Sequence, residues 1–260
     1  MLEALGLSED EERAYQRLVA GPSESADEVA TGLGVEASVA ATALAGLEEK
    51  GRGYPPSMRE DGWLFLTQGA FTDAAGHYAH SDVYFPEYTG RILVDGQEIW
   101  ATDWSLFLNE KIADGDHDVV VETRVQRENP FWQLSTDVET RWSFRSEQPT
   151  SSRTVLPMIG VDYRMDLSAT NSAPRGHYRF EVAFPTPQGP AASRIEHRRV
   201  EVSWGHGTTW ERLPLSRCEK DACSVTVSNR AAATASLRAE AEDRLGRSVE
   251  QTIIDAYAVR

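Results

Sequence analysis

The sequence predicts a mainly β protein in which tandem antiparallel β-sandwiches follow a small helical unit. From Trp63 onward, short segments alternate apolar and polar residues with a period of two, as half-buried strands do. Turn residues separate these segments roughly every 8–12 residues, and no helical pattern intervenes, which favours stacked antiparallel sheets. Before residue 53 the apolar residues instead recur at helical spacing.

Residues 1–53 contain the signals of three short helices. Capping-box patterns open the first helix at Ser8 and the second at Ser25, and the third spans about Glu36–Lys50, with Gly51 as its stop. A tight glycine turn before the third helix favours a helix-turn-helix arrangement.

Three stretches of this unit are informative: LGLSEDEERAYQRLV, ADEVATGLGV and LAGLEEKG. Over these residues the segment resembles the winged-helix domains of TrmB-like and LuxR-type bacterial regulators. It departs from them where a wing strand should follow, because residues 52–56 read Arg-Gly-Tyr-Pro-Pro. Residues 1–53 hold 11 acidic and 4 basic side chains, and the third helix contains no arginine. Since a reading helix needs donors for phosphates and bases, we expect a packing or protein-contact unit, with DNA an unlikely partner.

The prolines and glycine of residues 54–62 predict a linker. We expect a first sandwich at residues 63–148 and an immunoglobulin-like sandwich at 149–260, with the polar stretch 145–153 around their boundary. The first sandwich should contain strands at Trp63–Thr67, Arg91–Val94, Gln97–Trp100, Val119–Gln126 and Val138–Phe144. Asp95–Gly96 predicts a two-residue hairpin turn.

In the second sandwich, Thr154–Leu167 and His177–Phe184 are expected strands. Val200–Leu215 predicts a strand, a glycine turn and a return strand. Its expected partner is the C-terminal run Ala235–Val259, which turns at residues 244–247 into a last strand, Ser248–Val259.

The second half of the chain carries the stretches LSTDVETRWSFRS, LPMIGVDYRMDL, VEVSWGHGTTWERLPL and ASLRAEAEDRLGRSVEQTIIDAYAVR. With these stretches it resembles the C-terminal, non-catalytic region of large secreted subtilisin-like serine peptidases. The resemblance implies an extracellular β-sandwich accessory module rather than an active peptidase. The absence of a signal-peptide pattern at the N-terminus points instead to the cytoplasm, so localisation stays open.

Three clusters could carry chemistry. Gly205–Thr208 resembles the subtilase histidine motif around His206, but no matching serine or aspartate motif accompanies it, so we expect a turn. His77 and His80 lie near Asp73 and Asp82, and a loop is expected there rather than a metal site. The acidic run Asp114–Asp118 is expected to be a hairpin turn, with calcium as the alternative. We therefore predict no catalytic, cofactor-binding or metal-binding residue.

The two cysteines, Cys218 and Cys223, flank an expected turn. A cross-hairpin disulfide is sterically plausible, provided that the compartment is oxidising. The net charge of −15 argues against a nucleic-acid scaffold, and no stretch approaches the length of a membrane span.

These observations lead to the hypothesis of a non-catalytic accessory module that supports or recognises protein or glycan surfaces. The alternative is a transcriptional regulator with an N-terminal winged helix-turn-helix and a β sensor domain. Neither the ligand nor the oligomeric state follows from the sequence.

Overall fold

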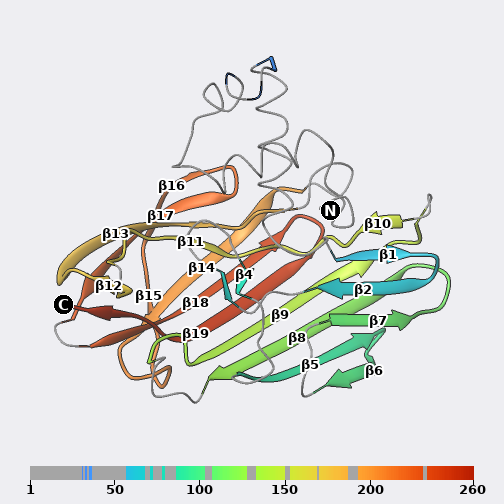
Figure 1. The fold of residues 1–260 in the computed structure, drawn as a ribbon, viewed down its shortest axis with the longest axis horizontal. Coiled ribbons are helices and arrows are strands. Elements are labelled where there is room, and N and C mark those ends of the chain that lie inside the picture. The colour runs from blue at the N-terminus through green and yellow to red at the C-terminus, as the bar shows by residue number, and fades with distance from the viewer. Residues whose placement is uncertain are drawn as a thin grey trace. The chain divides into compact units, whose positions relative to one another are not determined.

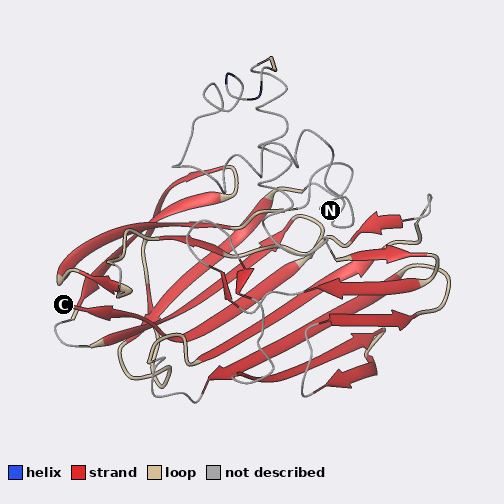
Figure 2. Cartoon of the chain, viewed as in Figure 1, coloured by secondary structure: helices blue, strands red, loops and turns tan. Residues whose placement is uncertain are grey.

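The computed structural model describes residues 31, 33, 35–36, 57–67, 71–72, 78–79, 86–102, 107–127, 133–149, 153–168, 170–186, 193–230 and 233–260. Contacts divide the chain into two compact units, residues 1–55 with 75–78 and residues 56–74 with 79–260. The second unit is built from strands (Figure 2). Among the described residues, no helix is long and apolar enough to cross a membrane.

The largest sheet runs in the order β15-β14-β18-β19-β9-β8-β5-β6, and β12 pairs in parallel with β19 (Figure 1). Its strands are β5 (Pro86–Val94), β6 (Gln97–Thr102), β8 (His117–Arg127), β9 (Asp137–Ser146), β12 (Ser172–Ala173), β14 (Ile195–Ser203), β15 (Glu211–Arg212), β18 (Thr234–Asp243) and β19 (Ser248–Val259). Neighbouring strands along this path are antiparallel. Some of them are consecutive in the chain, whereas others, such as β9 and β19, are distant in sequence.

Two four-stranded sheets accompany it. One has the order β10-β1-β2-β7, with β1 (Met58–Glu60), β2 (Trp63–Thr67), β7 (Phe107–Lys111) and β10 (Arg153–Val155). The other has the order β11-β13-β17-β16, with β11 (Asp162–Arg164), β13 (Gly176–Ala183), β16 (Leu215–Glu219) and β17 (Ala222–Asn229). The short strands β3 (Phe71–Thr72) and β4 (Tyr78–Ala79) pair with each other.

One hydrophobic core joins the three larger sheets. It includes Leu64 of β2, Phe180 of β13 and Leu237 of β18, each at most 4% exposed. Tyr178 of β13 and Tyr257 of β19 bring their rings to 6.3 Å across the core. Because alternate residues of each strand point into this core, burial alternates along β9 and β17. The large sheet therefore has one apolar side and one polar side.

Arg59 is a buried exception on β1, with no exposed surface. Its guanidinium donates to the carbonyl oxygens of Ala113 (2.9 Å), Gly115 (2.7 Å) and Glu147 (3.2 Å). Burial lowers the pKa of Arg59, and Asp114 and Asp116 oppose that effect. These bonds tie β1 to the turn before β8 and to the end of β9.

The mainly β prediction is confirmed, and several strand predictions agree closely with the structure. β2 spans the predicted Trp63–Thr67, β19 spans the predicted Ser248–Val259, and β14 pairs with β18 as expected. Asp95 and Gly96 form the predicted hairpin turn, with φ angles of 50° and 80°. The period-two pattern was sufficient here because each strand has one face in the core.

Other boundaries differ from the prediction. Thr154–Leu167 is not one strand, because only β10 and β11 form and an irregular segment around Pro157 separates them. Proline lacks the N–H that a ladder needs. The predicted return strand after Gly207 shortens to the two residues of β15, and the predicted linker 54–62 contains β1.

The expected division at residues 148–149 separates strands that belong to one sheet. β9 lies before it and β19 after it, and the two strands pair from Ser143 with Ser248 to Asp137 with Ile254. Residues 79–260 accordingly belong to a single compact unit. Alternation shows which face of a strand is buried but not which strand lies beside it, so the sequence could not reveal this pairing. Of the expected three-helix unit at 1–53, only Thr31, Leu33, Val35 and Glu36 are described, so that prediction lies almost entirely outside the described residues.

Candidate functional site

The polar side of the large sheet carries two rows of side chains that face each other across the strands. We call this surface the charged face. The first row, from β5 to β19, is Arg91, Glu122, Arg141 and Glu250. The second row, from β5 to β14, is Thr89, Arg124, Glu139, Thr252, Arg238 and Glu201. Both rows bring opposite charges next to each other in register, an arrangement that stabilises neighbouring strands.

Glu122 is the centre of the first row. Its carboxylate accepts hydrogen bonds from the guanidinium groups of both Arg91 and Arg141. The side chain of Glu122 is 23% exposed, whereas each of the two arginines is 51% exposed. The carboxylate is thus held beneath two cations that remain accessible from solvent.

Arg124 plays the corresponding role in the second row. It lies 2.5 Å from the carboxylate of Asp137 and 3.1 Å from that of Glu139. The hydrogen bond to Asp137 raises the pKa of Arg124, and burial opposes this with a smaller effect. A charge-assisted pair of this kind fixes the direction of the guanidinium plane.

A hollow of about 540 Å³ lies on the charged face over β5, β6, β8, β9 and β19. Its lining combines three arginines and three glutamates of the two rows with short residues: Arg91, Arg124, Arg141, Glu122, Glu139, Glu250, Thr89, Thr123, Thr140, Thr252, Gly90 and Ala101. Thr89, Thr252 and Ala101 belong to the charged face, whereas Gly90, Thr123 and Thr140 occupy the alternate positions of their strands. The hollow offers hydrogen-bond donors and acceptors with balanced charge, which suits a neutral polar ligand better than an ion.

Arg238 adjoins this hollow on the β18 side. It donates to Thr252 Oγ1 at 3.2 Å and lies 3.6 Å from the carboxylate of Glu201. Its guanidinium also stacks 4.2 Å from the ring centre of Trp210. Trp210 therefore lies against an arginine that bonds to Thr252, a residue of the lining.

Side-chain hydrogen bonds hold the glycine turn around His206 in place. Ser203 Oγ accepts hydrogen bonds from the backbone N–H groups of Gly205 (3.3 Å) and Gly207 (3.0 Å). His206 Nδ1 lies 2.8 Å from Asp255 Oδ2, and Thr234 Oγ1 donates to Asp255 Oδ1 at 2.6 Å. Within the described part of the chain, no serine hydroxyl bonds to His206. The imidazole links the turn to β19.

The acidic run at Asp114–Asp118 bonds to protein donors. Asp116 accepts the backbone N–H of Gln148 at 2.8 Å, and Asp118 lies 3.1 Å from Arg145. His117 Nδ1 lies 2.7 Å from Asp95 Oδ2, and this hydrogen bond raises the pKa of His117 and lowers that of Asp95. Across the residues that the structure describes, no group of three or more His, Cys, Asp or Glu could hold a metal.

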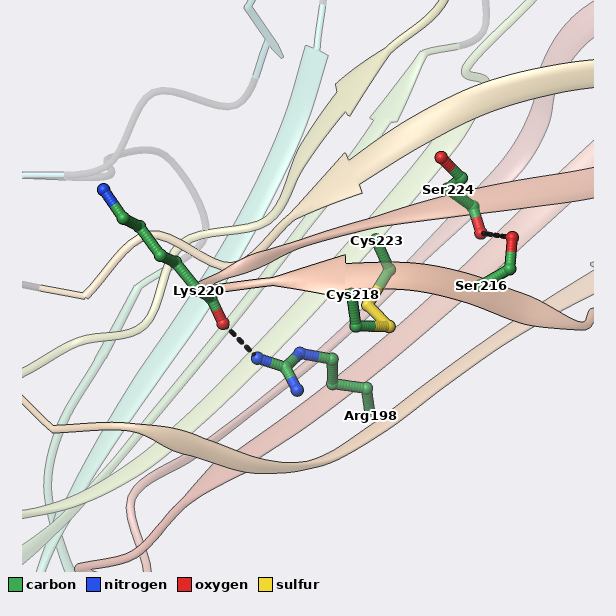
Figure 3. The surroundings of a disulfide bond; sticks show 6 residues. All are labelled: Arg198, Ser216, Cys218, Lys220, Cys223 and Ser224. Atoms are coloured by element: carbon green, nitrogen blue, oxygen red, sulfur yellow. Dashed lines mark hydrogen bonds between the residues drawn. A yellow bond between two sulfur atoms is a disulfide. The ribbon is translucent and has the colours of Figure 1, made fainter.

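His77, His80, Asp73 and Asp82, which the sequence offered as a conceivable metal cluster, lie outside the described residues. The two cysteines do lie within them. Cys218 on β16 and Cys223 on β17 are disulfide-bonded, with their sulfur atoms 2.09 Å apart (Figure 3). The bridge closes the hairpin between the two strands.

Sequence reasoning identified one part of the charged face and missed the rest. The alternation of Glu122, Arg124 and Gln126 with apolar neighbours predicted a solvated strand face. It gave no signal that Arg141 and Glu250 continue the row, because they come from β9 and β19, more than a hundred residues apart in the chain. Opposite charges at fixed spacing within single strands were the only available hint.

A family model described as sugar-specific transcriptional regulator TrmB matches residues 2–52, about a fifth of the chain. No curated protein matches the sequence. The chain is thus similar to the TrmB family over its N-terminal segment.

Proposed function

We propose that the protein is a DNA-binding transcriptional regulator whose β region is a non-catalytic recognition module. The observation that carries this proposal is the TrmB family match at residues 2–52. It agrees with the winged-helix resemblance of the same residues and favours the regulator over the accessory module as the leading hypothesis. The scarcity of basic residues in the segment means that affinity for DNA should be modest.

The test is a gel-shift assay of the full chain against promoter fragments from its own genome. The assay is run at about 0.05 M and at about 0.2 M salt, because the phosphate contacts on which DNA binding depends weaken as the salt concentration rises. A sequence-dependent shift supports the proposal. If no promoter fragment shifts at either salt concentration, the chain is not a DNA-binding regulator.

The β region would contain the site at which the regulator binds its ligand. We propose that the hollow on the charged face binds a neutral polyhydroxylated ligand such as a sugar. Arginines, glutamates and threonines line it together, so that hydroxyl groups would meet both acceptors and donors. The family whose model matches residues 2–52 is described as sugar-specific, which agrees with this ligand class.

Ala101→Phe tests the hollow without disturbing an ion pair, because Ala101 lies on its lining and aromatic residues suit strands. In calorimetric titrations with neutral mono- and disaccharides, the wild type should release heat on binding and the variant should lose at least about tenfold in affinity, equivalent to about 1.4 kcal/mol. Thr154→Phe, on exposed β10 of another sheet, is the matched control and should bind as the wild type does. Equal affinities for Ala101→Phe and the wild type would exclude the hollow.

A second candidate function is an extracellular accessory module of the kind found downstream of subtilisin-like peptidases. The disulfide between Cys218 and Cys223 favours it, because stable disulfides are typical of oxidising compartments. It predicts no DNA shift together with retention of cell-wall glycan or protein in a pull-down with the full chain. The gel shift therefore separates the two candidates.

A further inference from the structure

The disulfide lies where the sheet has least support. β16 is an edge strand, paired on one side with β17. Its register joins Leu215 to Val225, Ser216 to Ser224 and Glu219 to Ala222, and it breaks around Arg217, where φ is 49°. By contrast, β13 pairs with β17 continuously from Gly176 to Ala183. The bridge is therefore a main attachment of β16, whereas β17 is held independently of it.

Burial along β16 shows the same weakness. Its last four residues, Ser216–Glu219, are exposed, and only Leu215 packs against the core. The ring that the bridge closes is short, because the cysteines are five positions apart. A short closed loop constrains the unfolded chain less than a long one does, so this bridge contributes less to global stability than to the local order of β16.

The surroundings of the bridge suit thiol chemistry. Cys218 is exposed, and Cys223 is 1% exposed. Arg217 directly precedes Cys218, and the guanidinium of Arg198 on β14 donates to the carbonyl oxygen of Lys220 at 2.6 Å, whereas the side chain of Lys220 points away from the bridge (Figure 3). A nearby cation favours the thiolate of Cys218, which is the leaving group in the second step of the exchange, whereas burial disfavours the thiolate of Cys223. Glu219 and Asp221 in the same turn act in the opposite direction.

We infer that the Cys218–Cys223 bridge is a thiol–disulfide exchange site for a dithiol reductant, and that its reduction releases β16 from the sheet edge. This inference rests on the proposed function, because a regulator that works on DNA is surrounded by reducing thiols, where disulfides are usually transient. Reduction of the bridge would then regulate the β region at a site separate from the hollow on the charged face.

The exchange balances with one reductant. A thiolate of the dithiol attacks the exposed sulfur of Cys218, and the bond between Cys218 and Cys223 breaks. Cys223 leaves as a thiolate and takes a proton from solvent. The second thiol of the reductant loses its proton and attacks the mixed disulfide, which releases Cys218 as a thiolate that is protonated in turn. Two electrons and two protons pass to the protein, and the reductant becomes a cyclic disulfide.

The experiment treats the folded full chain with dithiothreitol and follows hydrogen exchange of the peptide that covers β16. Thiol counting with a chromogenic disulfide should show the two cysteines free after treatment, without denaturant. Amides of β16 should then exchange on the order of 30-fold faster, because the closed loop no longer restrains local opening. The peptide covering β18 is the internal control and should not change. Reoxidation should restore slow exchange, and the double variant Cys218→Ser with Cys223→Ser should behave as the reduced protein with or without reductant.

Two results would overturn the inference. One is a bridge that dithiothreitol opens only after denaturant is added, which makes it a buried structural link. The other is a reduced protein whose β16 amides exchange at the oxidised rate. Gel shifts of both forms keep the two proposals apart. If neither form shifts DNA but reduction speeds the exchange of β16, the DNA-binding proposal is wrong and the exchange site stands. If DNA shifts but reduction leaves the exchange of β16 unchanged, the DNA-binding proposal stands and the exchange site is wrong.

Discussion

At the scale of single residues, His117 and Asp95 form a hydrogen-bonded pair that the sequence analysis did not predict. The side chains lie 22 positions apart, and the hairpin turn at Asp95 brings them within 2.7 Å. Asp95 was predictable as a turn residue, since aspartate before glycine favours positive φ. Its second role depends on β8 lying beside β5, which is a property of the sheet.

The pair predicts a pH dependence of stability. Because the pKa of His117 is raised, its contribution is present below the ordinary histidine value and is lost as pH rises through the raised pKa. Because the pKa of Asp95 is lowered, its contribution is present above the ordinary aspartate value and is lost as pH falls through the lowered pKa. Denaturant unfolding between about pH 3 and about pH 9 should therefore show that the pair adds most to the free energy of unfolding between about pH 3.9 and about pH 6.5. Asp95→Asn keeps the turn and should flatten both limbs of the profile, and a variant profile that parallels the wild type would contradict the assignment.

At the scale of elements, the turn between β14 and β15 depends on Gly207. Its φ is +78°, and a Cβ there would lie 2.6 Å from Ile254 Cδ1 on β19. Gly96, in the turn between β5 and β6, has nearly the same φ of +80° but no heavy atom within 4 Å of a Cβ. These two glycines separate the cost of backbone strain from the cost of a steric clash.

Gly96→Ala should lower the free energy of unfolding by about 1 kcal/mol, from backbone strain alone. Gly207→Ala should lower it by about 1.5–2.5 kcal/mol, because the terminal methyl group of Ile254 must also leave its preferred rotamer. Chemical denaturation of both variants measures the difference. Equal losses would mean that the turn yields freely and that its packing against β19 is loose.

At the scale of the whole molecule, the pairing of β9 with β19 predicts that the two expected sandwiches do not fold apart. A fragment of residues 149–260 would lack β9 and would expose one edge and part of the apolar face of β19. We expect this fragment to lose the cooperative thermal transition that the full chain shows by circular dichroism. A fragment that melts as sharply as the full chain would show that the C-terminal strands are sufficient on their own.

The sequence alone determined that the described part of the region after Trp63 is mainly strands, because a period of two requires only one buried face per strand. It also placed the turns at Asp95–Gly96 and before Ser248, where glycines allow the backbone that a tight turn needs. Only the tertiary structure decided that strands on both sides of residue 148 share one sheet, and that Glu122, Arg141 and Glu250 stand in one row. Strand order and register are set by contacts between distant segments, and alternation is the same whichever neighbour a strand acquires.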